Sequence, residues 1–311
     1  MNGKNDLRRV KHRSSASQFN IRGIAKHYIL LIKNFSVLRK IMTTSQRKYF
    51  LSAAIIIKNE RDYIQEWIEY HLLIGVEHFY IFDNESTDDI LEVLQPYIDK
   101  KIVSYVFVKG AKKQIPAYIS TMVNHYKDTN WLVILDADEF LVSVGDENIK
   151  DFLKKTSFFT SQLLLGWMVF GSSGKEYREP GLVLERFKWH ASDDFIADYK
   201  PIIRPERYLR MKIPHWVDVL GKTIDENHKR IWDYPNTDFF SAIPAAKQKF
   251  RINHYYSKSL EEFKQKSVRG RHIKEKAPRN IADFKKHDQN KEQDSLVDKE
   301  INELKKILRS R

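Results

Sequence analysis

The sequence predicts an α/β protein with a mostly parallel sheet that is flanked by helices. Short apolar runs alternate with helical stretches of about 10–15 residues, and this alternation is typical of βαβ units. The apolar runs are nearly continuous, as expected for strands that are buried on both faces. A hydrophobic content of 42% over 311 residues is enough to form a large core.

The elements are expected in a regular order along the chain. Asn59 is expected to cap the first helix, and Gly75 to end it. Ser86 and Asp89 have the spacing of a capping box for the second helix, and Pro96 is expected to close that region. The predicted strands are 53–57, 78–82, 102–108, 131–135 and 250–256, and the predicted helices are 60–74, 86–96, 118–126 and a helix from 259 onward.

Positive charge is concentrated at the two ends of the chain. Residues 1–50 hold 12 Lys or Arg against one acidic residue, residues 256–311 hold 16 against 10, and residues 51–255 hold 26 against 30. A basic amphipathic helix is predicted over 21–42, which can lie on an anionic membrane, pack on the main domain or contact a second copy. A second amphipathic pattern, expected to dock on the body or on a membrane, runs through Ile301, Leu304, Ile307 and Leu308.

The composition narrows the class of protein. There is no cysteine, so disulfide bonds and thiolate metal sites are excluded, and a reducing compartment fits. No apolar run approaches the ~20 residues that a membrane-spanning helix needs. The N-terminus also lacks the apolar segment of a secretory signal.

Asp136 and Asp138 are the first candidate functional residues. They directly follow the apolar run 131–135, and if the chain stays extended there, both side chains point to the same face. In open α/β sheets, ligands bind at the carboxyl ends of the strands. Two close carboxylates repel each other, and a divalent cation keeps both ionised. The alternative interpretation is a solvated loop after the strand.

Polar residues also follow two other predicted strands, namely Lys58, Asn59, Glu60, Asp83 and Asn84. The carboxyl ends of parallel strands share one edge, so these residues are expected to converge with the Asp pair where a nucleotide would bind. Neither common glycine-rich phosphate loop occurs in the chain. A phosphate-bearing ligand must therefore be held in another way, and a metal ion on the Asp pair would do so.

An ordered set of segments carries a resemblance to a known family, over roughly residues 50–270: 58–60, 75–89, 136–140, 167–174, 253–259 and 262–263. Together they resemble glycosyltransferases of the GT-A fold, above all the family 2-like group and its relative, family 92. The resemblance implies a GT-A domain over 51–270 between two tails. Its parts are a nucleotide-sugar half at 51–140 and an acceptor half at 141–270, with a basic tail at 1–50 and a charged helical tail at 271–311.

The resemblance also implies a metal site. In such enzymes the Asp-x-Asp pair holds Mn²⁺ or Mg²⁺ against the diphosphate of a nucleotide-sugar, which implies this role for Asp136 and Asp138. A late histidine often completes the metal shell, and His254 is the implied match. His215 and His190 are weaker candidates for the same role.

The nucleotide contacts are implied in the same way. Acidic or amide residues after the second strand contact the base, which implies Asp83 and Asn84. The common family 2 form has Asp and Gly where this chain has Asn84 and Glu85, so the base contact of Asn84 is the weaker match. Lys58 and Glu60, at the end of the first strand, are expected to line the nucleotide site.

Enzymes of families 2 and 92 invert the configuration of the transferred sugar, so the resemblance implies a carboxylate that takes the proton of the acceptor hydroxyl. Asp193 and Asp194 are the predicted base, because they lie downstream of the Asp pair, where the family fold places it. A plain solvated loop is the alternative interpretation of these two residues. Glu176 and Glu179 are the next candidates for the base, and Glu139 is expected to support the metal site from outside.

The predicted function is therefore a metal-dependent transfer of a sugar from a nucleotide-diphosphate donor, with UDP favoured, to a glycan or glycolipid. Surface polysaccharide synthesis by a cytoplasmic enzyme, peripheral on the inner face of the membrane, fits best. A nucleotidyltransferase is an alternative, but it usually has a glycine-rich basic loop that 58–61 does not match. A basic module for nucleic acid or another anionic polymer would need a basic face, whereas 51–255 is net negative, so no nucleic acid is expected.

Overall fold

The computed structural model describes residues 35–43, 46–193, 195, 198–232, 247–268 and 279–310. The strands of the central sheet are β1 (Tyr49–Ile57), β2 (His78–Asp83), β3 (Val103–Phe107), β4 (Thr129–Ile134), β5 (Glu139–Ser143), β6 (Thr160–Val169), β8 (Tyr199–Ile203), β11 (Lys222–Ile224), β12 (Arg230–Ile231) and β13 (Phe250–His254). Two small two-stranded sheets are formed by β9 (Tyr208–Ile213) with β10 (Trp216–Val219), and by β7 (Trp189–His190) with β14 (Glu292–Gln293).

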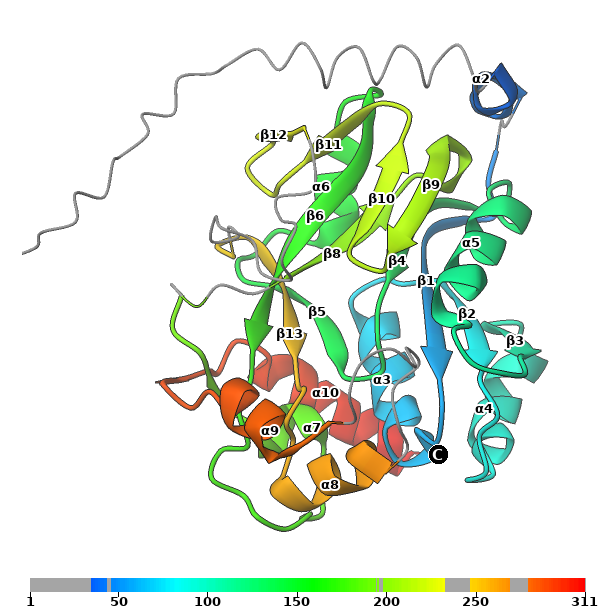
Figure 1. Cartoon of the computed structure of the whole chain (residues 1–311). Coiled ribbons are helices and arrows are strands. Elements are labelled where there is room, and N and C mark those ends of the chain that lie inside the picture. Colours follow the sequence, from blue (N-terminus) through cyan, green and yellow to red (C-terminus); the bar gives the residue numbers. More distant parts are fainter. Residues whose placement is uncertain are drawn as a thin grey trace, which may run out of the picture.

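The helices precede, connect and follow these strands. They are α2 (Phe35–Thr43), α3 (Arg61–Leu73), α4 (Ile90–Asp99), α5 (Gln114–Asn124), α6 (Ile149–Lys155), α7 (Val183–Arg186), α8 (Leu260–Val268), α9 (Ile281–His287), α10 (Asp298–Arg309) and the 3₁₀ turn η1 (Pro205–Arg207). The fold is thus mixed α/β, and Figure 1 shows a central sheet with helices around it. This confirms the fold class predicted from the sequence.

The first half of the sheet is parallel. Strand β1 pairs in parallel with β2 and β4, and β2 pairs in parallel with β3. From Leu51 onward, every residue of β1 is buried, which is why this strand is a continuous apolar run. The register places Asp83 beside Ile57, so the residues that follow β1 and β2 meet at the same edge.

The second half of the sheet is mixed. Strand β8 lies antiparallel between β4 and β6. Strand β13 pairs in parallel with β6 and antiparallel with β5. Its register places His254 opposite Glu139, which brings a residue from late in the chain beside the turn after β4.

Helices α8, α9 and α10 gather at the end of the sheet toward which β1 points (orange and red in Figure 1). Val297, Ile301 and Leu304 belong to the main hydrophobic core, and α10 packs against α3. The C-terminal amphipathic pattern was expected to dock on the body of the protein or on a membrane, and in the structure it packs on the body.

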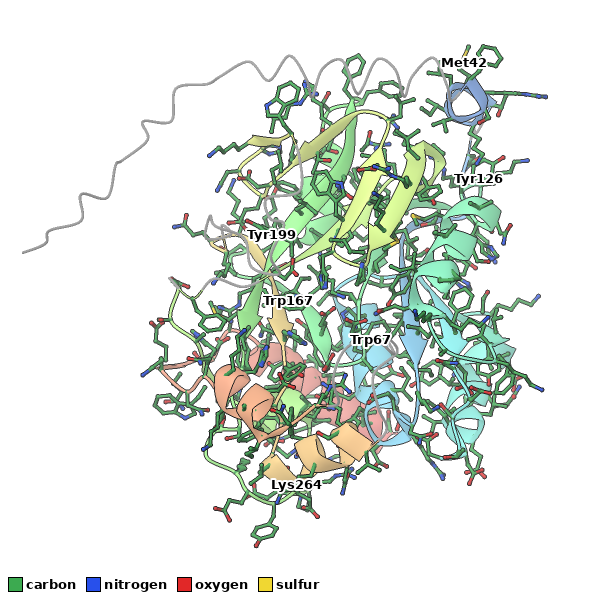
Figure 2. All side chains as sticks on the ribbon, in the orientation of Figure 1. Met42, Trp67, Tyr126, Trp167, Tyr199 and Lys264 are labelled. Carbon is green, nitrogen blue, oxygen red and sulfur yellow. The ribbon has the colours of Figure 1, made fainter. Side chains whose placement is uncertain are left out.

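Helix α2 lies at the opposite end of the sheet, where β1 begins. Figure 2 labels Met42 of α2 and Lys264 of α8, which mark these two opposite ends of the sheet. Within α2 only Val37 is buried, whereas Phe35 and Met42 are 77% and 84% exposed. Lys40 lies over the ring of Tyr126 at 4.6 Å and ties α2 to the body. The rest of the predicted N-terminal helix, residues 21–34, lies outside the described residues. In the part of the chain that the structure describes, no helix combines the length and apolar character needed to cross a bilayer.

Two of the predicted helix caps are wrong. Asn59 has a φ of 53°, and α3 begins after Glu60 without a side-chain cap. The Asn59 Oδ1 atom accepts a hydrogen bond from the Thr87 backbone N–H (2.7 Å), and the Ser86 Oγ atom accepts one from the Asn59 N–H (2.9 Å). These side chains therefore join the two loops at the sheet edge instead of capping their own helices.

The other end signals have mixed outcomes. Helix α4 begins only after Asp89, and Pro96 lies inside it, because the helix continues to Asp99. The capping box of α8 is present, as its sequence spacing indicates. The Glu262 N–H donates to Ser259 Oγ (3.2 Å), and the Ser259 N–H donates to Glu262 Oε2 (3.1 Å).

Candidate functional site

The chain turns directly after β4. The Glu139 N–H donates to the Asp136 carbonyl (3.1 Å), and the Asp136 N–H donates to Glu139 Oε2 (2.8 Å). Asp136 and Asp138 were expected to share one face if the chain stayed extended past Leu135, and this condition is not met, because these bonds close a turn. The two carboxylates nevertheless lie close enough for Asp138 to raise the pKa of Asp136.

Asp136 is held by three side chains. Lys200 of β8 places its Nζ atom 2.8 Å from Oδ2, while Gln114 Nε2 (2.9 Å) and the Tyr118 hydroxyl (3.3 Å) donate to Oδ1. Burial raises the pKa of Asp136, but the attraction and hydrogen bond of Lys200, together with His215, hold this pKa below its ordinary value. Asp136 is therefore an ionised carboxylate with partners on both oxygens.

Glu139 is the second partner of Lys200. The Lys200 Nζ atom lies 3.0 Å from Glu139 Oε2, and both side chains are fully buried. Burial raises the pKa of Glu139 well above its ordinary value, and Lys200 offsets this only in part. The Glu139 side chain holds the Asp136 N–H, and its role in supporting a metal site stays a prediction.

Asp138 is paired with a lysine and lies near a histidine. Lys266 of α8 forms an ion pair with Asp138 Oδ2, and His254 Nε2 lies 3.7 Å from the same oxygen. Burial raises the pKa of Asp138, but Lys266 and His254 outweigh it and hold this pKa well below its ordinary value. Burial lowers the pKa of Lys266 to about 8, with Asp138 opposing, so its ammonium predominates at pH 7.

The three predicted metal-site histidines lie in different surroundings. The His254 ring lies 4.1 Å from that of Trp167, beside Asp138. The His215 ring meets the same indole edge-on, with 5.1 Å between the ring centres, and its Nδ1 atom bonds to the Tyr199 carbonyl. Trp167 and Tyr199 are labelled in Figure 2. Burial lowers the pKa of His215 to about 4. His190 bonds to the carbonyl of Ala191 at 2.6 Å.

The predicted Mn²⁺ or Mg²⁺ site does not fit this arrangement. A divalent ion on the Asp pair needs free carboxylate oxygens directed at one point. Here both oxygens of Asp136 have donors, and Asp138 Oδ2 carries the Lys266 ammonium. Among the described residues, no group of three or more His, Asp or Glu is arranged to hold a metal ion. A metal role for Asp136, Asp138 and His254 stays a prediction, and it would require Lys266 to move.

The residues predicted to contact the nucleotide lie at the expected edge. Asp83 accepts hydrogen bonds from the Tyr105 hydroxyl (2.7 Å) and the Ser86 N–H (2.9 Å). The Asn84 amide donates to the carbonyls of Val108 (3.1 Å) and Gly110 (3.0 Å). Asp83 and Asn84 are both buried and tie loops together, whereas Lys58 and Glu60 are half-buried. Nucleotide contact by these four residues stays a prediction.

Asp193, Glu176 and Glu179 are the candidates for the catalytic base that the structure describes. Asp193 is exposed, and its carbonyl accepts a hydrogen bond from Lys247 (3.3 Å); Asp194 lies outside the described residues. Glu176 and Glu179 are also exposed, and Glu179 pairs with Lys175 at 2.5 Å. No contact joins the described candidates to Asp136 or Asp138.

A pocket of about 200 Å³ lies at the carboxyl end of β1, between α3 and α8. It is lined by Asn59, Asp62, Tyr63, Asp88, Ser257, Lys258, Glu262, Gln265 and Lys266. Small-molecule sites typically have roughly 300–1,000 Å³, so this pocket has room for part of a nucleotide-sugar. Lys266 connects the pocket to Asp138.

The two lysines were missed by the sequence analysis. Lys200 had a detectable signal, because it interrupts an otherwise apolar run of five residues, 199–203, and a lysine in a buried strand needs a carboxylate partner. Lys266 had none, because it is one of two lysines on an amphipathic helix.

The fold and site define a mixed α/β protein with a lysine-paired acidic cluster at the carboxyl edge of its parallel strands. The chain belongs to glycosyltransferase family 92, whose family model matches residues 53–309. This confirms the kinship expected from the sequence.

Two plant proteins are among the relatives that are similar to this chain. A glycosyltransferase family 92 protein of Ricinus communis is 25% identical over 72% of this chain and 38% of its own length. One of Arabidopsis thaliana is 31% identical over 30% of this chain and 16% of its own length. The chain thus spans well under half the length of these relatives.

Among solved structures, TarS 1–349 of S. aureus is similar to this chain. Its complex with UDP has 16% identity and a TM-score of 0.34, covering 50% of this chain and 47% of that one. Without that ligand it has 14% identity and a TM-score of 0.37, covering 67% and 60%.

Proposed function

We propose that this chain transfers a sugar from a nucleotide-diphosphate donor, with UDP favoured, to a glycan or glycolipid acceptor. The main support is that Lys266 pairs with Asp138 beside a pocket, at the carboxyl edge of the parallel strands. Membership of glycosyltransferase family 92 supports the same proposal. The biological setting we propose is surface polysaccharide synthesis, with the basic ends of the chain toward an anionic membrane.

The proposed reaction inverts the configuration of the sugar. The bond between the anomeric carbon and the diphosphate oxygen breaks, and its electron pair leaves with the diphosphate. The acceptor oxygen forms the new bond from the opposite face, and a carboxylate takes its proton. Negative charge develops on the departing diphosphate, where cationic groups lower the barrier. Asp193 and Asp194 stay the predicted base.

A thermal-shift panel tests the donor class. UDP, GDP, CDP and ADP are compared on the full chain, each with Mn²⁺ and with a chelator. A ligand at ~100 times its Kd adds about 2.7 kcal/mol of stability. Of the four nucleotides, we expect only UDP to give a clear shift. The substitution Asp138→Asn should reduce this shift. Asp151→Asn, on the exposed surface of α6, is the control and should keep the shift. Absence of a shift with all four nucleotides would contradict the proposed function.

A further inference from the structure

We propose that the Lys266 ammonium, held in place by Asp138, binds the donor diphosphate, and that this chain binds its nucleotide donor without a divalent metal ion. The inference rests on the proposed function, because it names the cation of that same site. The first support is that the carboxylate oxygens which a metal ion would need already have other partners. Lys200 satisfies Asp136, and Lys266 occupies the Asp138 oxygen that lies nearest His254.

The position of Lys266 suits a phosphate ligand. Its side chain is 14% exposed and lines the pocket beside Asp138. A lysine ammonium has three N–H donors. Toward the described residues, Lys266 uses them on the Asp138 carboxylate and the Tyr256 carbonyl (3.1 Å). One donor therefore remains for a phosphate oxygen.

Two further groups of the pocket favour an anion. Lys258 brings a second ammonium, which lies 3.2 Å from the centre of the Tyr63 ring. The Ser257 hydroxyl is buried and has no hydrogen-bond partner among the described residues. A buried hydroxyl without a partner is costly, and a phosphate oxygen in this pocket can accept its hydrogen bond.

The acidic residues of the pocket have other partners, which limits their repulsion of a diphosphate. Asp62 pairs with Arg178 at 2.5 Å, and Glu262 makes a two-point contact with Arg186 at 2.8 and 2.9 Å. Asp88 accepts a hydrogen bond from the backbone N–H of Arg61 at 2.9 Å on Oδ2, while its buried Oδ1 has no partner among the described residues.

Lys200 cannot replace Lys266 in this role. It is fully buried between Asp136 and Glu139, whereas Lys266 reaches the pocket. Of the two lysines that neutralise the Asp pair, only Lys266 lies on the pocket wall.

The test is calorimetric titration of the full chain with UDP and with uridine, in EDTA and in Mn²⁺. We expect wild type to bind UDP equally well, within about twofold, in both solutions. Lys266→Met should weaken UDP binding in EDTA on the order of tenfold to a hundredfold, the loss of one charge-assisted hydrogen bond. Uridine, which has no phosphate, should bind wild type and Lys266→Met alike. Lys264→Met, on the exposed face of the same helix, should behave as wild type.

The outcomes separate this inference from the proposed function. UDP binding that needs Mn²⁺ overturns the inference and leaves the proposed function standing. Absence of UDP binding in both solutions overturns the inference, and the proposed function is contradicted as well only when GDP, CDP and ADP also fail to bind. Lys266→Met leaves Asp138 buried without its lysine, so the double variant Asp138→Asn/Lys266→Met removes both charges and protects the fold. Wild-type affinity for UDP in EDTA, in either the single or the double variant, overturns the inference.

Discussion

Replacing Lys200 by Met should destabilise the protein, because it leaves two carboxylates in the interior without their cation. Lys200 is fully buried and lies 2.8 Å from Asp136 and 3.0 Å from Glu139. Removing one partner of a buried ion pair typically costs about 3–5 kcal/mol. Methionine keeps most of the apolar volume, so the loss reports the charge and little cavity formation.

Two features of the site place the loss near the lower limit of that range, at about 3 kcal/mol. The Asp136 side chain is 29% exposed and can regain hydration. Glu139 already has a raised pKa, and it can take up a proton when Lys200 is gone. The free energy of unfolding in urea, followed by tryptophan fluorescence, measures the loss.

A double-mutant cycle separates the charge effect from general damage. Adding Glu139→Gln to Lys200→Met removes one uncompensated carboxylate and should recover about 1–2 kcal/mol. Lys212→Met, at an exposed position in β9, should stay within about 0.5 kcal/mol of wild type. A loss below about 1 kcal/mol for Lys200→Met, or the same loss with and without Glu139→Gln, would refute the reasoning.

Three other predictions concern pH, a helix cap and the membrane. Burial lowers the pKa of His71 to about 3, and its ring accepts the Leu141 N–H. The unfolded chain takes up this proton near pH 6.5, so stability falls from there toward pH 3, by up to about 1.4 kcal/mol per pH unit. Urea unfolding at several pH values should show a flatter slope for His71→Gln, and an unchanged slope contradicts the assignment. Ser259→Ala removes the cap of α8 and should cost about 1 kcal/mol in the same assay, with Ser310→Ala as the neutral control; equal stability of the two would count against the cap. Deleting residues 1–45 should abolish sedimentation with anionic liposomes at low salt, and unchanged binding would argue against a membrane role for this end.

In the parallel half of the sheet, β1, β2 and β4 were predictable from sequence, because these three strands are buried on both faces. Burial on both faces leaves a continuous apolar run such as residues 53–57, and that pattern needs no knowledge of the partner strand. The caps were less predictable. Asn59 and Ser86 have the right chemistry for capping, but they bond to each other's loops, and sequence spacing does not contain that choice.

The candidate site was predictable only in part, for a related reason. The polar residues after β1, β2 and β4 share an edge because the strands are parallel. The approach of His254 to Asp138 instead depends on the register of β13 against β5, across more than a hundred residues of sequence. Only the family resemblance indicated it. The turn that redirects Asp138 depends on the Glu139 side chain, which returns to bond the Asp136 N–H.

Lys200 and Lys266 each neutralise one member of the Asp pair. The cluster holds three carboxylates, Asp136, Asp138 and Glu139, against the ammoniums of Lys200 and Lys266. Lys200 is sealed in the core, so its loss should appear mainly as lost stability. Lys266 meets the pocket, so its loss should appear mainly as lost nucleotide affinity. If both substitutions lowered stability equally and left affinity unchanged, Lys266 would be a structural counter-ion of the same kind as Lys200. The cation for the diphosphate would then have to come from elsewhere.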